Sequence, residues 1–543
     1  MSLPIPLTVR LRTPRVDRHV TVDARDLVMR WTDPGGYASC TVPLARPLTT
    51  QPDEIAYYGQ VTVYDARDGS VVWDGRMEDP GRGAGGDGQI WDLTAVGGQA
   101  HTRDRTVPLI YVQRLGSSDF RRAAVNVTGA TVGGGDDPGG SGKDALVVQF
   151  PDGLHISNTS RVSARYDGIA LAGQKIALIG YAWDGGSNDA NMNVDAILST
   201  GGGANDTART ATISTNGGPY ATRVVGTNWA NGRDTLDLRY WRTAGGLYTV
   251  PSDLAWASFT DIAVVAMRFD ATGSERTTGY ADTVLASEVV ADLIGRLLTD
   301  YDGATATIAA TTHAIDQLAY PDGVTAAQVL EDLLALESRY TWRAWERTDA
   351  GRYRFEWVQR PSSVRYECDV VDGYDSQGSA DGLYNMVTVR WRDSAGRSRF
   401  VFRSSVVPEL VAAGLNRQAS IDLGSDVGSS ADAIRAGDQF LAEHQYALNG
   451  GRLRVARPIL DMETGRMVMP WEIRPGLIRV RGILPRIDAL NATDRDGVTV
   501  FRIVSSEYRA SDGAATLELD SYARTTPRLL STLMRRMPSF RRR

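Results

Sequence analysis

Cysteines, lysines and long apolar runs are scarce in this sequence. Only two cysteines, Cys40 and Cys368, occur in 543 residues. They lie far apart, which excludes a disulfide framework and a paired-cysteine metal knuckle. No stretch approaches the roughly 20 apolar residues of a membrane helix. The first residues, MSLPIPLTVRLRTPR, lack the apolar run of a signal peptide. We therefore expect a protein that neither spans a membrane nor leaves the cell by the usual export route.

Positive charge comes almost entirely from arginine, because Lys143 and Lys175 are the only lysines among 59 basic residues. The net charge of −6 argues against a protein that coats nucleic acid. The length permits three or four domains. A hydrophobic content of 42% with 56 glycines is typical of a folded, turn-rich β protein.

Catalytic motifs are missing as well. A GxGxxG pattern at Gly81–Gly86 joins two predicted strands, whereas a dinucleotide site needs it to open a helix. The loop GGSGKD around Lys143 imitates a phosphate loop, but Asp137 and Asp144 stand where that motif needs Gly and Ser or Thr. The five histidines are isolated from one another. We predict no catalytic residues, no metal site and no cofactor. The sequence does not exclude a pair of catalytic carboxylates for glycan hydrolysis, because such a pair is recognised by the distance between its two carboxyl groups in space and not by its spacing in the sequence.

Short alternating strands fill most of the sequence, which predicts a mainly β fold of the α+β class. VTVYDARDGSVVWDGRMED reads as two strands around a turn. Between Asn126 and Asp270, long loops rich in Gly, Asn, Asp and Ser separate apolar strands, which indicates a β-sandwich. Its predicted core residues are Ile176, Leu178, Ile262, Val264 and Val265.

Helical periodicity is confined to a few segments. The clearest begins at Thr325, which we predict to cap a helix in a capping box with Gln328. One apolar face follows, made of Ala326, Val329, Leu330, Leu333 and Leu334. The period then changes to two, and TWRAWERTDAGRYRFEWVQR predicts a hairpin. Further helices are expected over Ala286–Leu297 and Ala431–Leu448, the latter capped by Ser429 or Ser430.

A set of degenerate motifs recurs in a fixed order along the chain. They are Trp73-Asp74-Gly75-Arg76, Leu93–Gly97, Asp322-Gly323-Val324-Thr325 with its helix, Tyr384-Asn385-Met386-Val387-Thr388-Val389, Pro475-Gly476, Phe501-Arg502-Ile503 and Leu517-Glu518-Leu519. This ordered set resembles the tail hub, also called the minor tail or tail-associated protein, of long-tailed bacteriophages. A weak internal echo accompanies it, since VVWDGRMED and QIWDLTAVG near one end are similar to FRIVSSEYR and ATLELDSYA near the other.

The resemblance implies two tube-like β-barrel or sandwich hub domains, a helix-containing bracing domain and an inserted β-sandwich similar to jelly-roll carbohydrate-binding modules. The expected divisions are 1–115 and 383–525 for the hub domains, 281–382 for the bracing domain, 126–270 for the insertion and 526–543 for a basic tail. The family's hub is a homotrimer. Its two tube-like domains per chain form a pseudo-sixfold ring that continues a hexameric tail tube and passes DNA.

This reading makes the chain a structural virion protein at the tail tip, assembled in the host cytoplasm, and not an enzyme. Its expected partners are tail tube or distal tail proteins, the tape measure protein and tail fibre or spike proteins. The insertion should lie outside the ring, because inside it would obstruct DNA. Two alternatives remain: a cell-wall glycan hydrolase and a stand-alone glycan-binding protein.

Two groups of residues are candidates for contacts with partners. Aromatic rings near loops or strand ends of the insertion are suited to stack on a host cell-surface glycan, although core packing claims most tryptophans in sandwiches; they are Trp183, Trp229, Tyr240 and Trp241. A basic end is suited to dock on an acidic surface of a neighbouring tail protein, or it is a frayed terminus; its arginines are Arg535, Arg536, Arg541, Arg542 and Arg543.

Overall fold

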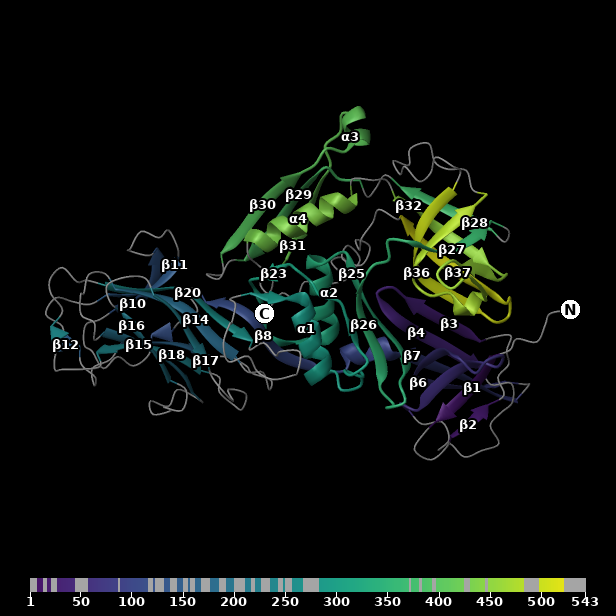
Figure 1. Cartoon of the computed structure of the whole chain (residues 1–543), viewed down its shortest axis with the longest axis horizontal. Coiled ribbons are helices and arrows are strands. Elements are labelled where there is room, and N and C mark those ends of the chain that lie inside the picture. The colour runs from purple at the N-terminus through teal and green to yellow at the C-terminus, as the bar shows by residue number, and fades with distance from the viewer. Residues whose placement is uncertain are drawn as a thin grey trace.

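The computed structural model of the chain is shown in Figure 1. It describes residues 7–12, 17–20, 27–43, 57–85, 88–115, 283–370, 373–379, 383–392, 397–423, 430–444, 448–482 and 498–521. Between 116 and 282 it describes the backbone of the strands alone. Most of the described secondary structure is β, with a few helices, which confirms the predicted mainly β fold.

The N-terminal β unit is one curled antiparallel sheet with the order β2–β1–β5–β6–β7–β4–β3. Its strands are β1 (Leu7–Arg12), β2 (Asp17–Val20), β3 (Val28–Thr32), β4 (Gly35–Pro43), β5 (Gln60–Asp65), β6 (Val71–Gly85) and β7 (Gly88–Gly97). Gly81–Gly85 of the GxGxxG pattern form the end of β6, which pairs antiparallel with the next strand, β7, and Gly86 lies outside the described residues. The prediction that it joins two strands is therefore confirmed.

The C-terminal β unit has the order β28–β32–β37–β36–β35–β27–β33–β34, with the β27–β35 pair parallel and the other pairs antiparallel. Its strands are β27 (Val364–Asp369), β28 (Tyr374–Ser379), β32 (Leu448–Val455), β33 (Ile459–Asp461), β34 (Arg466–Val468), β35 (Leu477–Arg481), β36 (Val498–Arg509) and β37 (Ala514–Ser521). β27 and β28 come from the segment that we assigned to the bracing domain. Sequence alone does not show which sheet a strand joins.

A helical brace lies beside the two β units. It contains α1 (Ala286–Asp292), the π-helical turn η5 (Leu293–Leu297), β24 (Leu318–Thr325), α2 (Ala326–Leu336), β25 (Tyr340–Arg347) and β26 (Tyr353–Gln359), with the short strands β21 (Val284–Leu285), β22 (Thr307–Ile308) and β23 (Ala314–Ile315). The predicted apolar face of α2 is buried, and the predicted hairpin is β25–β26. Thr325 Oγ1 caps the helix by accepting from Gln328 N at 3.3 Å. The second arm of the capping box is absent, because Gln328 Nε2 donates instead to Asp332 Oδ1 at 2.8 Å.

A smaller unit, which we call the α4 unit, is interposed between β28 and β32. It comprises β29 (Met386–Arg392), β30 (Ser398–Ser404), α3 (Pro408–Ala412), β31 (Gln418–Asp422) and α4 (Ser430–His444). The order of its sheet is β30–β29–β31, and α4 packs on β29 and β30. The predicted end of this helix at Leu448 is wrong, since Leu448 begins β32. The alternative cap, Ser429, lies outside the described residues.

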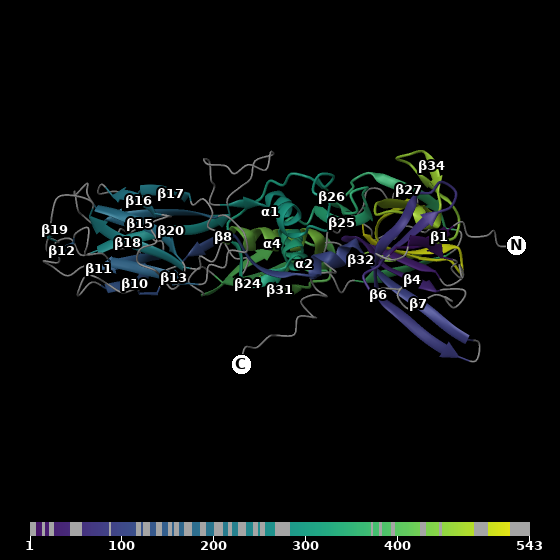
Figure 2. The ribbon, with the colours of Figure 1, turned by 90° about the horizontal axis from the view of Figure 1, so that it is seen from below.

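The insertion consists of antiparallel sheets reached through β8 (Thr106–Leu115). One sheet has the order β10–β11–β20–β14–β17, with β8 also beside β20 and β24 beside β8, and the other has the order β16–β15–β18–β13–β9. The strands are β9 (Arg121–Arg122), β10 (Thr131–Asp136), β11 (Asp144–Gln149), β12 (His155–Ile156), β13 (Val162–Asp167), β14 (Ile176–Asp184), β15 (Met192–Ser199), β16 (Thr210–Thr215), β17 (Tyr220–Val225), β18 (Thr235–Arg242), β19 (Tyr248–Thr249) and β20 (Trp256–Ala266). Figures 1 and 2 both show the brace between the insertion and the β units. The predicted core residues lie in the paired strands β14 and β20.

Candidate assembly interface

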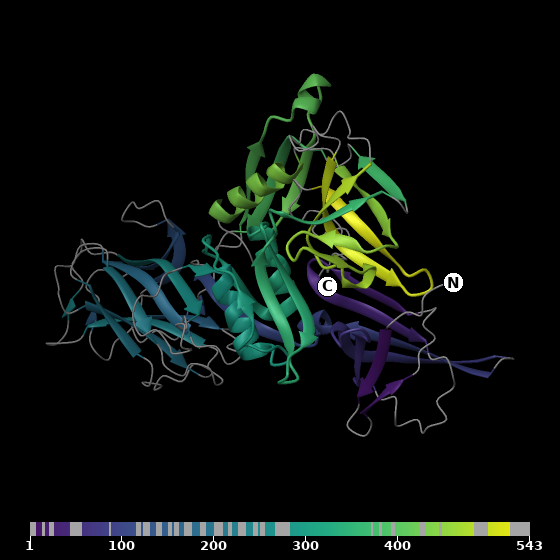
Figure 3. The same cartoon turned by 45° about the vertical axis from the view of Figure 1, so that its right-hand side comes forward.

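One antiparallel ladder joins the N-terminal and C-terminal β units into a continuous sheet. β3 pairs with β36 from Val28 opposite Arg509 to Thr32 opposite Ser505. Just beyond the ladder, Asp33 N donates to the Val504 carbonyl at 2.8 Å. β36 pairs with β35 along its first half and with β3 along its second half, so one strand belongs to both units. Figure 3 shows the two units meeting along this line.

The two β units also share a single hydrophobic core. Buried side chains of the first unit, such as Val63 and Trp73, belong to the same cluster as Phe501 and Leu517 of the second. Tryptophans near the junction satisfy their indole N–H groups across it. Trp31 Nε1 donates to the Ile473 carbonyl at 2.8 Å, and Trp471 Nε1 donates to Asp65 Oδ2 at 2.9 Å. The units are therefore one packed body.

Arg474 of the C-terminal unit lies between aromatic rings of the other parts. Its guanidinium donates to the Tyr37 hydroxyl at 2.6 Å and sits 4.8 Å from the ring centres of Tyr37 and Trp345. Burial raises the pKa of Tyr37 well above its ordinary value, so this phenol stays neutral. The contact combines a cation–π interaction with a charge-assisted hydrogen bond. It ties β4, β25 and the C-terminal unit together at one point.

A buried ion pair fixes the brace to the junction. Arg343 of β25 lies 3.1 Å from Asp33 Oδ1, and Thr341 Oγ1 donates to the same oxygen at 2.6 Å. Burial raises the pKa of Asp33, but the charges and hydrogen bonds, chiefly from Arg343, outweigh it and leave that pKa below its ordinary value. Beside this pair β25 runs parallel to β4, with Ala344 opposite Gly36. A Cβ at Gly36 would stand 2.2 Å from the Ala344 carbonyl oxygen, so only glycine permits this approach.

A second buried carboxylate connects the brace to β6. Arg347 Nη1 donates to Asp74 Oδ1 at 2.6 Å, and Arg347 N donates to Asp74 Oδ2 at 2.8 Å. Burial raises the pKa of Asp74 and outweighs the opposing charge of Arg347. Arg347 also covers the ring of Tyr353 at 4.1 Å from its centre. Both ion pairs therefore act as positioning contacts between elements.

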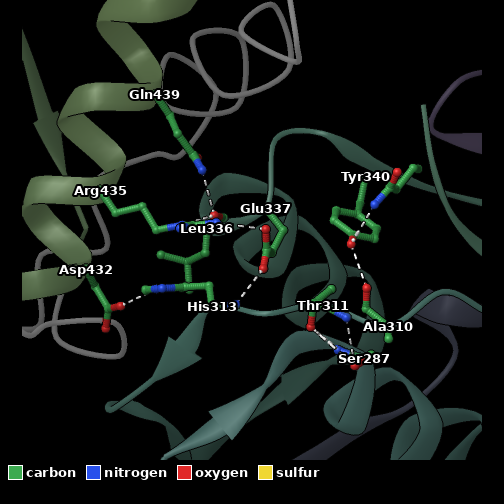
Figure 4. A network of polar contacts seen from close by, with 11 residues as sticks. Ser287, Ala310, Thr311, His313, Leu336, Glu337, Tyr340, Asp432, Arg435 and Gln439 are labelled. Carbon is green, nitrogen blue, oxygen red and sulfur yellow. Dashed lines mark hydrogen bonds and ion pairs between the residues drawn. The ribbon is translucent and has the colours of Figure 1, made fainter. Parts of the chain in front are cut away.

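The α4 unit is held to the end of α2 by the polar network in Figure 4. Arg435 Nε and Gln439 Nε2 both donate to the Leu336 carbonyl at 2.9 Å, which supplies donors to the end of a helix. Arg435 also lies 2.9 Å from Glu337 Oε2. His313 Nε2 lies 2.8 Å from the buried Asp432 Oδ1. The network links three segments that are distant in sequence and fixes the orientation of α4.

The two β units repeat the same strand order. The sequence β3–β4–β7–β6–β5–β1 in the first unit matches β28–β32–β37–β36–β35–β27 in the second, except that the last pair is antiparallel in one and parallel in the other. A register shift interrupts the central hairpin of each, between Met77 and Asp79 in β6 and between Ile503 and Ser505 in β36. These hairpins are the two segments of the internal echo in the sequence.

Of the predicted contact residues, the described ones lie in strands of the insertion, away from this interface. Trp183 is in β14, whereas Tyr240 and Trp241 are in β18 of the other sheet, so the backbone divides the set between two sheets. Trp229 and the five C-terminal arginines lie outside the described residues. Sequence reasoning did not identify Asp33, Arg343 or Arg474. Arg343 is a charged residue among apolar ones in β25, whereas Asp33 lies in the turn after β3 and Arg474 lies in the segment before β35, so no shared local pattern marks them.

Across the described ranges, no group of three or more His, Cys, Asp or Glu side chains is placed to hold a metal ion. Within those same ranges, no helix has the length and apolar character that crossing a membrane requires.

Replacing Arg343 by Met should destabilise the junction by roughly 3–5 kcal/mol, the usual cost of leaving one member of a buried pair unpaired. In the unmodified chain, the lowered pKa of Asp33 stabilises the fold above the unfolded carboxyl pKa of about 3.9. That contribution is lost as pH falls through the folded pKa. Without Arg343, burial raises the pKa of Asp33 above that of the unfolded carboxyl group. The folded variant then binds a proton more readily than the unfolded chain, so its stability should increase from pH 7 to pH 5 relative to the unmodified chain. Thermal midpoints at both pH values measure this.

The matched control for that substitution is Asp33→Asn with Arg343→Met. It removes both charges and should recover part of the stability and lose the added pH dependence. If the thermal midpoint of the Arg343→Met variant changes with pH as that of the unmodified chain does, the stabilising role assigned to the Asp33–Arg343 ion pair is contradicted.

No protein-family model matches this chain, and no curated protein matches it. Among solved structures, it is similar to a tail protein from Neisseria meningitidis MC58 at 9% identity and a TM-score of 0.43, over 96% of this chain and 98% of that one. It is similar to the prophage MuSo2 43 kDa tail protein from Shewanella oneidensis at 10% identity and a TM-score of 0.41, over 95% and 98%. A prophage tail protein from Listeria monocytogenes EGD-e gives 10% identity and a TM-score of 0.35, over 98% of both chains. At these TM-scores the likeness carries no functional conclusion.

Proposed function

We propose that this chain is a structural protein of a bacteriophage tail, and more specifically the trimeric hub at the distal tip of the tail tube. The observation that carries the proposal is the repeated strand order of two β units that share one core and one sheet. A chain with two equivalent units supplies two of six positions in a ring, and three chains complete it. The ordered motifs that resemble the tail hub family support the same reading.

The charged groups of the interface support a structural role over a catalytic one. Asp33 and Asp74 have shifted pKa values, which in an enzyme would mark candidate acids or bases. Here each is held by an arginine of β25 and joins two parts of the fold. In the proposed virion the hub contacts tail tube or distal tail proteins, the tape measure protein and tail fibres or spikes. It assembles in the host cytoplasm and passes DNA through its ring.

Tail tips released from particles should contain three copies of this chain. Two equivalent units per chain and a closed ring with six positions require that number. Native mass spectrometry or analytical ultracentrifugation of the released tip measures it. A tip that contains only one or two copies would overturn the ring. Isolated recombinant protein is the weaker sample, because ring closure can depend on the tube.

We further propose that the insertion binds a host cell-surface glycan on the outside of the ring. The test is binding of full-length protein to a glycan array and to host cell walls. Trp183→Ala or Trp241→Ala should weaken binding about tenfold, equivalent to about 1.4 kcal/mol. The matched control is Tyr57→Ala, which removes an aromatic residue that is 68% exposed in the N-terminal unit.

Uniformly blank arrays from folded protein would overturn glycan binding and leave the structural proposal intact. Release of soluble fragments from a dye-labelled cell wall would instead favour the hydrolase. The full chain is the appropriate sample, because β20 of the insertion hydrogen-bonds to β8, which lies before Asn126.

We also propose that the basic C-terminal residues dock on an acidic surface of a neighbouring tail protein. Replacing their five arginines by Gln should reduce particle assembly without lowering the thermal midpoint of the free protein, because only the partner contact is lost. Replacing them by Lys keeps the charge and should preserve assembly. Normal particle yield from the Gln variant would identify a solvated terminus.

A further inference from the structure

Two strand segments of the described chain pair on one side only. In β6, Asp79–Gly83 pair with β7, while β5 reaches only as far as Arg76. In β28, Asp375–Ser379 pair with β32 and with no other described strand. Figures 2 and 3 show the β6–β7 hairpin projecting beyond the rest of the N-terminal unit. Within the part of the chain that the structure describes, no strand other than β7 pairs with Asp79–Gly83.

The equivalents of these two segments pair with each other inside the chain. Met77 and Ile503 occupy the same place, since each donates its N–H to a glycine carbonyl (Gly59 at 2.7 Å and Gly476 at 3.0 Å). The register shift follows each of them directly. Because Met77 is equivalent to Ile503, the residues that follow them are also equivalent, and Asp79–Gly83 correspond to Ser505–Arg509. Those residues of β36 form the ladder with β3.

The second equivalence follows from the partners across each sheet. In the first unit, Met77 pairs with Ala95 on the next strand, Ala95 with Cys40, and Cys40 with Met29. In the second unit, Ile503 pairs in the same way with Leu519, Leu519 with Gly451, and Gly451 with Ser376. Met29 therefore corresponds to Ser376, and Val28–Thr32 correspond to Asp375–Ser379. Each chain therefore contains two segments equivalent to β3 and two equivalent to the second half of β36. Only one such pair, β3 with β36, forms a ladder within the chain.

We propose that Asp79–Gly83 of one copy pair antiparallel with Asp375–Ser379 of a second copy, with Asp79 opposite Ser379 and Gly83 opposite Asp375. The inference rests on the proposed function, because it supplies the contact between identical chains. The interface is head-to-tail, so each copy uses its β6 edge toward one neighbour and its β28 edge toward the other. It repeats between chains the β3–β36 ladder that joins the units within a chain, and it extends the sheet by strand addition.

One position of the proposed ladder differs from its template. Pro80 corresponds to Ser506, and it has no N–H to donate. Asp33 N donates to the Val504 carbonyl, so by the alternation of an antiparallel ladder Ser506 also faces β3. The contact between copies therefore lacks one donor. Proline is tolerated at an open strand edge, and there it disfavours pairing with unrelated strands.

The same alternation identifies the best site for a cross-link. Ser505 and Thr32 form a non-hydrogen-bonded pair, and so would Asp79 and Ser379. The Cα atoms of such a pair lie about 4.5 Å apart, which is within the range of a disulfide. The native Cys40 and Cys368 are both buried. Burial raises the pKa of each thiol, so background oxidation should be slow.

The test is mild oxidation of full-length protein that carries Asp79→Cys and Ser379→Cys. It should give covalent oligomers at least tenfold more abundantly than Asp79→Cys with Asp375→Cys. In that control the second cysteine lies on the same face of the strand but four residues away, about 13 Å along it. A mixture of the two single variants should give a covalent dimer and no larger species, because each chain then has one half of the pair.

The outcomes separate this inference from the proposed function. A trimer by native mass that cross-links no better than the control overturns the strand pairing and leaves the ring standing. A chain that stays monomeric, both in released tips and under oxidation, overturns both. Equal cross-linking by the two double variants would indicate random collision and also overturns the register.

Discussion

The ladder between β3 and β36 is the contact on which the rest of this structure depends. It joins strands from opposite ends of the chain, so a very long loop must close before it forms. The shared hydrophobic core offsets that entropic cost, since both units bury their inner faces against each other. Without the ladder the chain would have two separate small sheets, each with an open edge beside the other. With it, the brace and the α4 unit have a fixed body to pack on.

Charge is buried where three parts of the fold meet, and it sets orientation there more than it adds stability. Asp33 with Arg343 and Asp74 with Arg347 each join β25 to the N-terminal unit. Buried pairs of this kind contribute little net free energy compared with apolar packing, but losing one partner is costly. The pairs therefore penalise any other placement of β25. The close approach of β4 at Gly36 imposes the same placement by sterics.

The two β units are alike in strand order but not in sequence. The position of Met77 is taken by Ile503, which is also apolar, whereas Pro80 stands where the other unit has Ser506. Ladder geometry depends on main-chain hydrogen bonds, so side chains can change while the register stays. The surroundings of the two strands also differ, because β3 pairs with Ser505–Arg509 of β36, whereas among the described strands only β7 pairs with Asp79–Gly83 of β6.

The sequence by itself determined the local elements, while tertiary structure decided their partners. α2 and the β25–β26 hairpin were predictable because the capping residue, the apolar spacing and the change of period lie within one segment. The membership of β27 and β28 in the C-terminal sheet was not predictable, since alternation identifies a strand but not its neighbour. Asp33 and Arg343 could not be paired in advance for the same reason. Their burial depends on a strand that arrives from a distant part of the chain, and nothing local to either residue encodes that distance.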